Sequence, residues 1–113
     1  MTSTFCLTYP NLAWTPQRLV YDDVVEAIAE YTKDVSPGIS DLFAHSGSEY
    51  TGGMVFINDW TNPQDFQIVL DAVIKYRQEA VDDADRRRLE EDYFNCVDEL
   101  IGMLKQKIQE LKK

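Results

Sequence analysis

Apolar residues recur at helical spacing in three long segments of this chain, and this pattern limits the fold more than any other feature of the sequence. In residues 16–33 the i, i+3, i+4, i+7 spacing of a buried helix face falls on Tyr21, Val24, Val25 and Ile28. In residues 63–80 a similar stripe falls on Phe66, Val69, Leu70, Val73 and Ile74. Thr15-Pro16 and Asn62-Pro63 precede the stripes, and a capping residue followed by proline is typical of a helix start. We therefore expect a helix in each segment.

The third stripe predicts one helix from about residue 84 to residue 111, with the spacing of a coiled coil. Its apolar residues are three and four positions apart, at Phe94, Val97, Ile101, Leu104, Ile108 and Leu111. We expect this helix to fold back as a hairpin on the stripe of the helix before it. A second interpretation, which is compatible with the first, is that the distal end pairs with another copy of the chain. A projecting helix end would leave Ile108 and Leu111 exposed, which a monomer tends to avoid.

Two segments have strand-like sequences, so the expected sheet is small. Residues 4–9 alternate apolar or aromatic residues with Thr and Cys, and residues 54–60 are mostly apolar, which suggests burial on both faces. The long connection between them includes a short helical turn at residues 39–44 and permits either a parallel or an antiparallel pair. Two strands alone are marginal in water. The expected fold class is α+β: a small two-stranded sheet covered by helices, with a long C-terminal helix or helical hairpin.

Charge divides the chain into two unequal parts of one expected domain, residues 1–113. A chain of 113 residues can bury a core without metal or disulfide staples. Residues 1–85 carry 14 acids and 4 bases, a net charge of −10, whereas residues 86–113 carry 6 acids and 7 bases, a net charge of +1. An acidic α+β body of about residues 1–80 is thus followed by an amphipathic helix of about residues 84–111.

The net charge of −9 argues against nucleic acid or an anionic membrane as a direct ligand, because both need basic patches. Arg86–Arg88 is the only basic run, and each arginine has an acid four residues further on with which to pair. No apolar run approaches the roughly 20 residues that cross a bilayer, and no secretion signal is found, so we expect a cytoplasmic protein. Cys6 and Cys96 lie in apolar runs and are expected to be buried and reduced, with a disulfide as the alternative.

No catalytic or metal-binding constellation is found. His45, the only histidine, is followed by Ser46-Gly47, which is more typical of a loop near a helix end than of a catalytic base. Neither a phosphate loop nor a nucleophile elbow occurs, and the His and Cys residues are too scattered for zinc. The Asp82–Asp85 cluster lacks the pattern of an EF-hand and is expected to cap a helix. We therefore expect no enzymatic activity, no metal and no cofactor, with a carboxylate-based enzyme as the third-ranked alternative.

Five acids of the first expected helix and its end form what we call the acidic ridge: Asp22, Asp23, Glu26, Glu30 and Asp34. Three of them lie at i, i+4 and i+8, a spacing at which like charges destabilise an isolated helix by about 0.2–0.5 kcal/mol per pair. Two interpretations are open. The ridge is a solvated helix face that only keeps the protein in solution, or it is a surface that a basic partner protein recognises.

The leading hypothesis is a small binding protein that uses the acidic ridge to occlude a basic surface of another protein. An immunity protein, an antitoxin or another toxin inhibitor, including one that mimics nucleic acid, is its most concrete form. A nuclease or another nucleic-acid-binding protein is the expected target. The alternative is a homo-oligomeric structural or adaptor module assembled through Ile101, Leu104, Ile108 and Leu111. Three aromatic residues near turns are expected to cap the core rather than to anchor an interface: Trp14, Tyr50 and Trp60.

Overall fold

The computed structural model describes residues 3–8, 12–16, 18–47, 49, 52–82 and 91–112. Within these ranges the elements follow in the order β1 (Thr4–Thr8), β2 (Leu12–Trp14), α1 (Arg18–Thr32), α2 (Pro37–Ala44), β3 (Met54–Phe56), α4 (Pro63–Asp82) and α5 (Glu91–Lys112). The expected helices and the short helical turn are all present. Several sequence-based predictions lie outside the described residues: Tyr50, the beginning of the last helix before residue 91, most of the Asp82–Asp85 cluster and the Arg86–Arg88 run.

The three strands form a mixed sheet in the order β2-β1-β3. β1 pairs antiparallel with β2, where Phe5 lies opposite Trp14, and parallel with β3, where Phe5 lies opposite Val55. The sequence left open whether the two expected strands pair parallel or antiparallel, and in the structure they pair parallel. The prediction of only two strands is wrong, since β2 is a third strand. The sequence did not reveal β2, because it is three residues long and has no periodicity of its own. Its extended conformation depends on pairing with β1.

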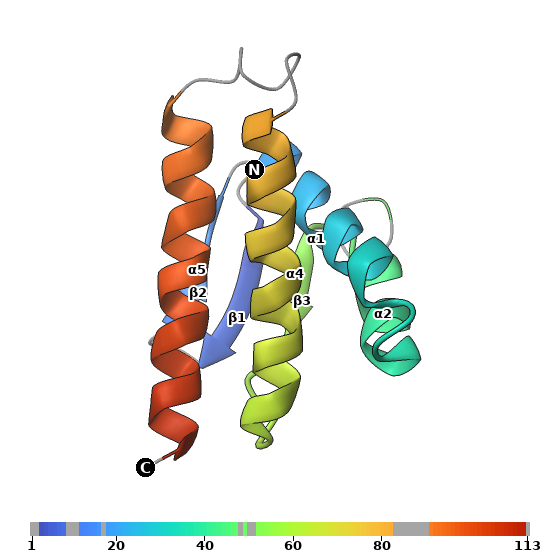
Figure 1. The fold of residues 1–113 in the computed structure, drawn as a ribbon, viewed down its shortest axis with the longest axis vertical. Helices are drawn as coiled ribbons and strands as arrows, with labels where there is room; N and C mark the ends of the chain where they lie inside the picture. The colour runs from blue at the N-terminus through green and yellow to red at the C-terminus, as the bar shows by residue number, and fades with distance from the viewer. Residues whose placement is uncertain are drawn as a thin grey trace.

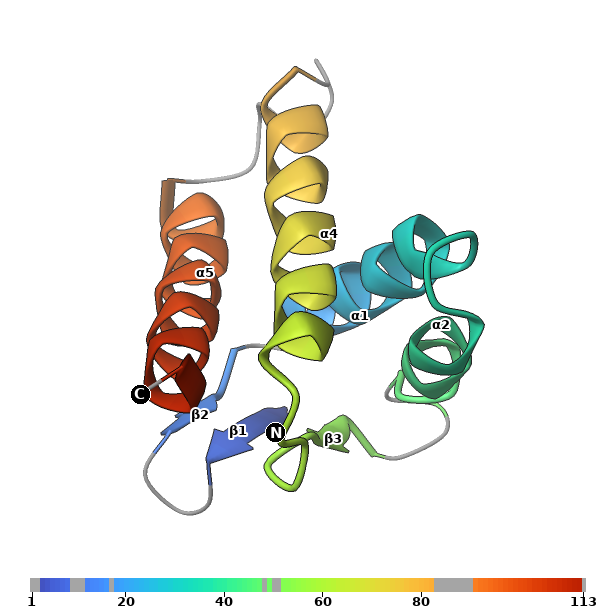
Figure 2. The ribbon, with the colours of Figure 1, turned by 60° about the horizontal axis from the view of Figure 1, so that its bottom comes forward.

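The described helices lie on one side of the sheet, as Figure 2 shows for α4 and α5 above β1 and β2. Side chains of β3 therefore alternate, with Val55 buried and Met54 and Phe56 exposed by 48% and 52%. The expectation that this strand is buried on both faces is wrong. An apolar run shows that a strand can be covered, but it does not show how many faces are covered.

The core lies between the sheet and the apolar stripes of the helices. All four residues of the α1 stripe are buried, as predicted. On α4 the stripe runs through Phe66, Val69, Leu70 and Val73, but the prediction for Ile74 is wrong, since its side chain is 42% exposed. Ile74 lies about 100° around the helix from Val73, and Tyr76 and Ala80 continue the buried face instead.

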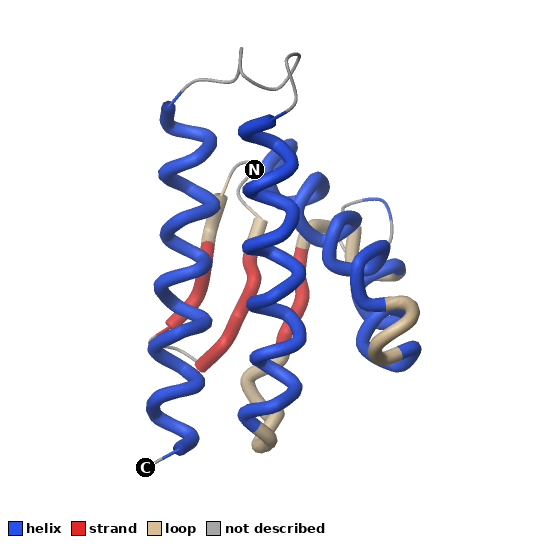
Figure 3. Tube along the Cα trace, viewed as in Figure 1, coloured by secondary structure: helices blue, strands red, loops and turns tan. Residues whose placement is uncertain are grey.

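The two long helices form the predicted hairpin, with α5 lying beside α4 along most of its length (Figures 1 and 3). The Arg77 guanidinium joins them by donating to the Asp98 carboxylate, with Nη2 3.1 Å from Oδ2, and it lies 5.5 Å from the centre of the Phe94 ring. The other side of α5 covers the sheet. There the Trp14 indole Nε1 donates to the Cys96 carbonyl oxygen at 2.8 Å.

The distal end of α5 belongs to this same core. Leu104 is fully buried and Ile108 is 4% exposed, whereas Ile101 and Leu111 are half-buried. Next to them Lys107 is buried as well, and its ammonium donates to the Thr8 hydroxyl at 2.7 Å. The reason given for pairing with a second copy, a projecting end that leaves Ile108 exposed, does not hold, because Ile108 belongs to the core of the chain itself. Packing within the chain accounts for the heptad-like spacing, and assembly through these four residues stays a prediction.

Two glycines before β3 offer a matched test of local packing. Gly52 and Gly53 both have positive φ, +73° and +92°, which favours glycine. A Cβ on Gly52 would meet open space, but a Cβ on Gly53 would lie 2.8 Å from Oγ of the buried Ser3. We expect Gly52→Ala to lower the free energy of unfolding by about 1 kcal/mol and Gly53→Ala by at least about 2 kcal/mol. Urea denaturation measures both, and equal losses would show that Ser3 moves aside without cost.

Candidate partner-binding groove

A groove of about 590 Å³ lies between α1, α2 and the segment that follows α2. Four carboxylates line it: Asp22, Glu26 and Glu30 from successive turns of α1, and Glu49 from that following segment, where it is helical. Among the described residues of its lining, Lys33 is the only base, and its ammonium lies 3.5 Å from the Glu30 carboxylate with both side chains exposed. The described lining therefore carries four acids and one base, a net charge of −3.

Apolar side chains form the inner wall of the groove. Val25 and Phe43 are buried there, while Ala29 is half-buried and Ala44 is exposed. The Phe43 ring packs on Phe5 of the sheet, with ring centres 5.6 Å apart, so this wall is continuous with the core. A ligand in the groove would thus meet an apolar floor and a rim of carboxylates.

Hydrogen bonds between α1 and the α2 region hold the two sides of the groove together. The Ser40 hydroxyl donates to the Ala29 carbonyl oxygen at 2.6 Å, and the Tyr21 hydroxyl donates to the Ser46 carbonyl oxygen at 2.6 Å. α2 begins at Pro37 because Ser36 caps it and accepts the Ile39 backbone N–H. These bonds are buried or partly buried, which fixes α2 against α1 before any ligand binds.

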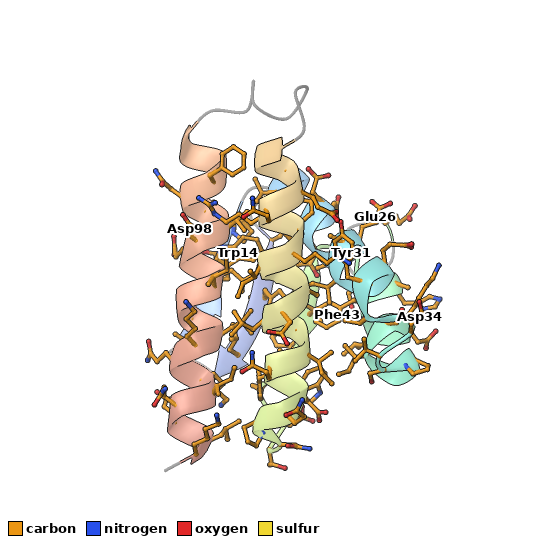
Figure 4. All side chains as sticks on the ribbon, viewed as in Figure 1. Trp14, Glu26, Tyr31, Asp34, Phe43 and Asp98 are labelled. Carbon is orange, nitrogen blue, oxygen red and sulfur yellow. The ribbon has the colours of Figure 1, made fainter. Side chains whose placement is uncertain are left out.

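The structure brings three of the five ridge residues together at the groove. Asp23 is half-buried and lies about 100° around the helix from Asp22, so it points away from the lining. Asp34 is exposed in the turn after α1 and also lies outside the lining. Figure 4 shows Glu26 and Asp34 on the outer side of the molecule, away from the α4–α5 hairpin. Glu49 was missed, because it is helical in the structure but stands among Gly, Ser and Thr residues whose sequence has no apolar periodicity to mark a helix.

Other candidate chemical groups do not gather at this groove. His45 ends α2 as an exposed residue, as predicted, with Nδ1 2.9 Å from the Asp41 carbonyl oxygen. In the part of the chain that the structure describes, no three His, Cys, Asp or Glu side chains are placed to hold a metal ion together. The groove carboxylates are therefore arranged as separate charges rather than as a chelating cluster.

The two cysteines are free thiols, Cys6 buried and Cys96 half-buried. The two cysteines do not form the alternative disulfide, and the prediction of full burial is wrong for Cys96. Burial raises the pKa of the Cys6 thiol, and the positive charge of Lys107 opposes this only in part. Burial also raises the pKa of Cys96, with Glu99 adding to the effect and the Trp14 hydrogen bond opposing it. Neither thiol has the lowered pKa that marks a reactive nucleophile.

The raised pKa of Cys6 predicts a loss of stability in alkali. Unfolded cysteine ionises near pH 8.5, below the folded pKa, so the unfolded state releases its proton first. The contribution of the Cys6 thiol to the free energy of unfolding is intact below about pH 8.5 and declines above it, by at most about 1.4 kcal/mol per pH unit. We expect the free energy of unfolding to fall less steeply between pH 8.5 and 9.5 in Cys6→Ala than in the wild type. Equal slopes in urea denaturation would contradict this.

Comparison with known proteins gives no match to a family model, a curated protein or a solved structure. Over the described ranges, no helix combines the length and the apolar character needed to span a bilayer.

Proposed function

We propose that this protein is a small acidic binding protein that occludes a basic surface of a partner protein. The observation that supports this most is that Asp22, Glu26, Glu30 and Glu49 surround one groove with an apolar floor. A helix face that served only solubility would not need a fourth carboxylate, from a separate segment of the chain, at the same groove. Complementary charge would speed the encounter, and the body of the protein would then cover the partner's surface.

An inhibitor of a nucleic-acid-binding protein is the most concrete form of this proposal. Such a target presents lysines and arginines to phosphates, and a surface with the opposite charge can compete for them. An immunity protein or an antitoxin that blocks a nuclease works in this way. Steric occlusion and charge complementarity are sufficient for this mechanism, and no catalytic group in the groove is required.

Charge reversal with a matched control tests the proposal. Glu26→Lys/Glu30→Lys changes two groove residues, and Glu79→Lys/Glu99→Lys changes two exposed residues on α4 and α5 that lie outside the groove. Both variants change the net charge by the same amount. We expect the groove variant to associate with the cognate partner at least about tenfold more slowly at low salt, while the control stays close to wild type.

The partner for this measurement would be recovered from a lysate of the source organism at low salt and eluted at high salt. Purified partner would then be assayed for nucleic-acid binding with each version of the protein present. Wild type and the control should block that binding, and the groove variant should not. Equal behaviour of the two charge-reversed variants would mean that only net charge matters, and the proposed groove would then be wrong.

A further inference from the structure

We infer that the groove takes arginine or lysine side chains from one segment of the partner protein, with their aliphatic stems on the apolar floor and their charged ends at the carboxylate rim. This inference rests on the proposed function and adds what enters the groove. It starts from the combination of Val25, Ala29, Phe43 and Ala44 beneath Asp22, Glu26 and Glu30. Arginine and lysine have the matching construction, an apolar stem that ends in a cation.

The positions of the charges favour a row of separate cations. Asp22, Glu26 and Glu30 lie on successive turns of α1, so they follow the groove over about 12 Å. Neither these carboxylates nor Glu49 belong to a group of described side chains that could share one metal ion. A single divalent ion would therefore reach only part of the rim, whereas a segment with several basic side chains can follow the row of carboxylates along the groove.

The composition of the chain indicates that the occupant is a different protein. A second copy brings 20 acids and only 11 bases, so two copies carry a net charge of −9 each and repel one another. The floor is preformed, because Ser40 and Tyr21 fix α2 to α1 and Phe43 packs on the sheet. A basic segment can therefore enter without the cost of ordering the groove.

A pair of synthetic peptides distinguishes stem packing from charge alone. The first is a short peptide with three arginines, and the second carries the same three guanidinium groups on stems that are two methylenes shorter. The guanidinium stays ionised in both, so the peptides have equal charge. Titration of labelled peptide by fluorescence anisotropy at low salt should show at least fivefold weaker binding for the short-stem peptide.

Variants of the full chain place this effect in the groove. Ala44→Tyr fills the floor without changing charge and should weaken binding of the arginine peptide at least fivefold. Leu42 is an exposed α2 residue outside the lining, and Leu42→Tyr should leave this binding unchanged. Equal binding of the two peptides, with loss in Glu26→Lys/Glu30→Lys, would overturn the inference and leave the proposed function standing. Binding that Glu26→Lys/Glu30→Lys does not weaken would count against both. If neither peptide binds, the inference is overturned.

Discussion

Replacing Ile108 with glutamate is expected to unfold the protein rather than to separate a dimer. The Ile108 side chain is 4% exposed and belongs to the core of the chain itself. Glutamate at this position would remove apolar burial and place a carboxyl group where water does not reach. We expect the free energy of unfolding to fall by more than about 4 kcal/mol, which is a large part of the stability of a small domain. Circular dichroism during urea denaturation measures this directly.

Leu111→Glu is the matched control, because Leu111 is three residues further along the same stripe and only half-buried. It should change the free energy of unfolding by less than about 1.5 kcal/mol. One outcome would restore the oligomeric interpretation of α5: Ile108→Glu stays fully folded as a monomer while the wild type sediments as a dimer. Ile108 would then belong to an interface.

Trp14→Ala is expected to lower the free energy of unfolding by about 3–5 kcal/mol, which is the second large effect. Trp14 is one of the largest buried side chains, and it packs edge-to-face on Phe5 with ring centres 6.2 Å apart. Its indole N–H also donates to the Cys96 carbonyl oxygen of α5. The indole therefore joins β2, β1 and the last helix, and its removal leaves a cavity where these elements meet.

Trp14→Phe separates packing from the hydrogen bond. Phenylalanine keeps an aromatic ring against Phe5 but cannot donate to the Cys96 carbonyl, and we expect a smaller loss of about 1–2 kcal/mol. Urea denaturation of the two variants side by side is the measurement. Similar losses for Trp14→Phe and Trp14→Ala would mean that the hydrogen bond, and not the volume of the ring, is the main contribution of this residue.

Helices in this protein could be predicted because their signal extends over many residues. The α1 stripe from Tyr21 to Ile28 is buried along the predicted face. The α5 stripe from Val97 to Ile108 also repeats over several turns and is buried except at Ile101, which is half-buried. β2 could not be predicted, since three residues are too few for a pattern. Its strand conformation depends on pairing with β1, which is a property of the tertiary structure.

The residues of the candidate site also differ in whether the sequence could predict them. Asp22, Glu26 and Glu30 share one face of a helix, so their spacing alone predicts that they lie together. The groove between them and α2 depends on how two helices pack, and Glu49 comes from a separate segment after α2. Asp23 and Asp34 are close in sequence to the groove residues, but neither lines the groove.

The hydrogen bonds of α5 to the two early strands also determine when the fold can be completed. Lys107 and Thr8 are 99 residues apart, and Cys96 and Trp14 are 82 residues apart. Closing such long loops makes folding slower than in a helical bundle with mainly local contacts. At a synthesis rate of about 5–20 residues per second, the 22 residues of α5 take roughly 1–4 s to make. Until α5 is complete, the parts of β1 and β2 that it contacts in the folded protein stay without this cover.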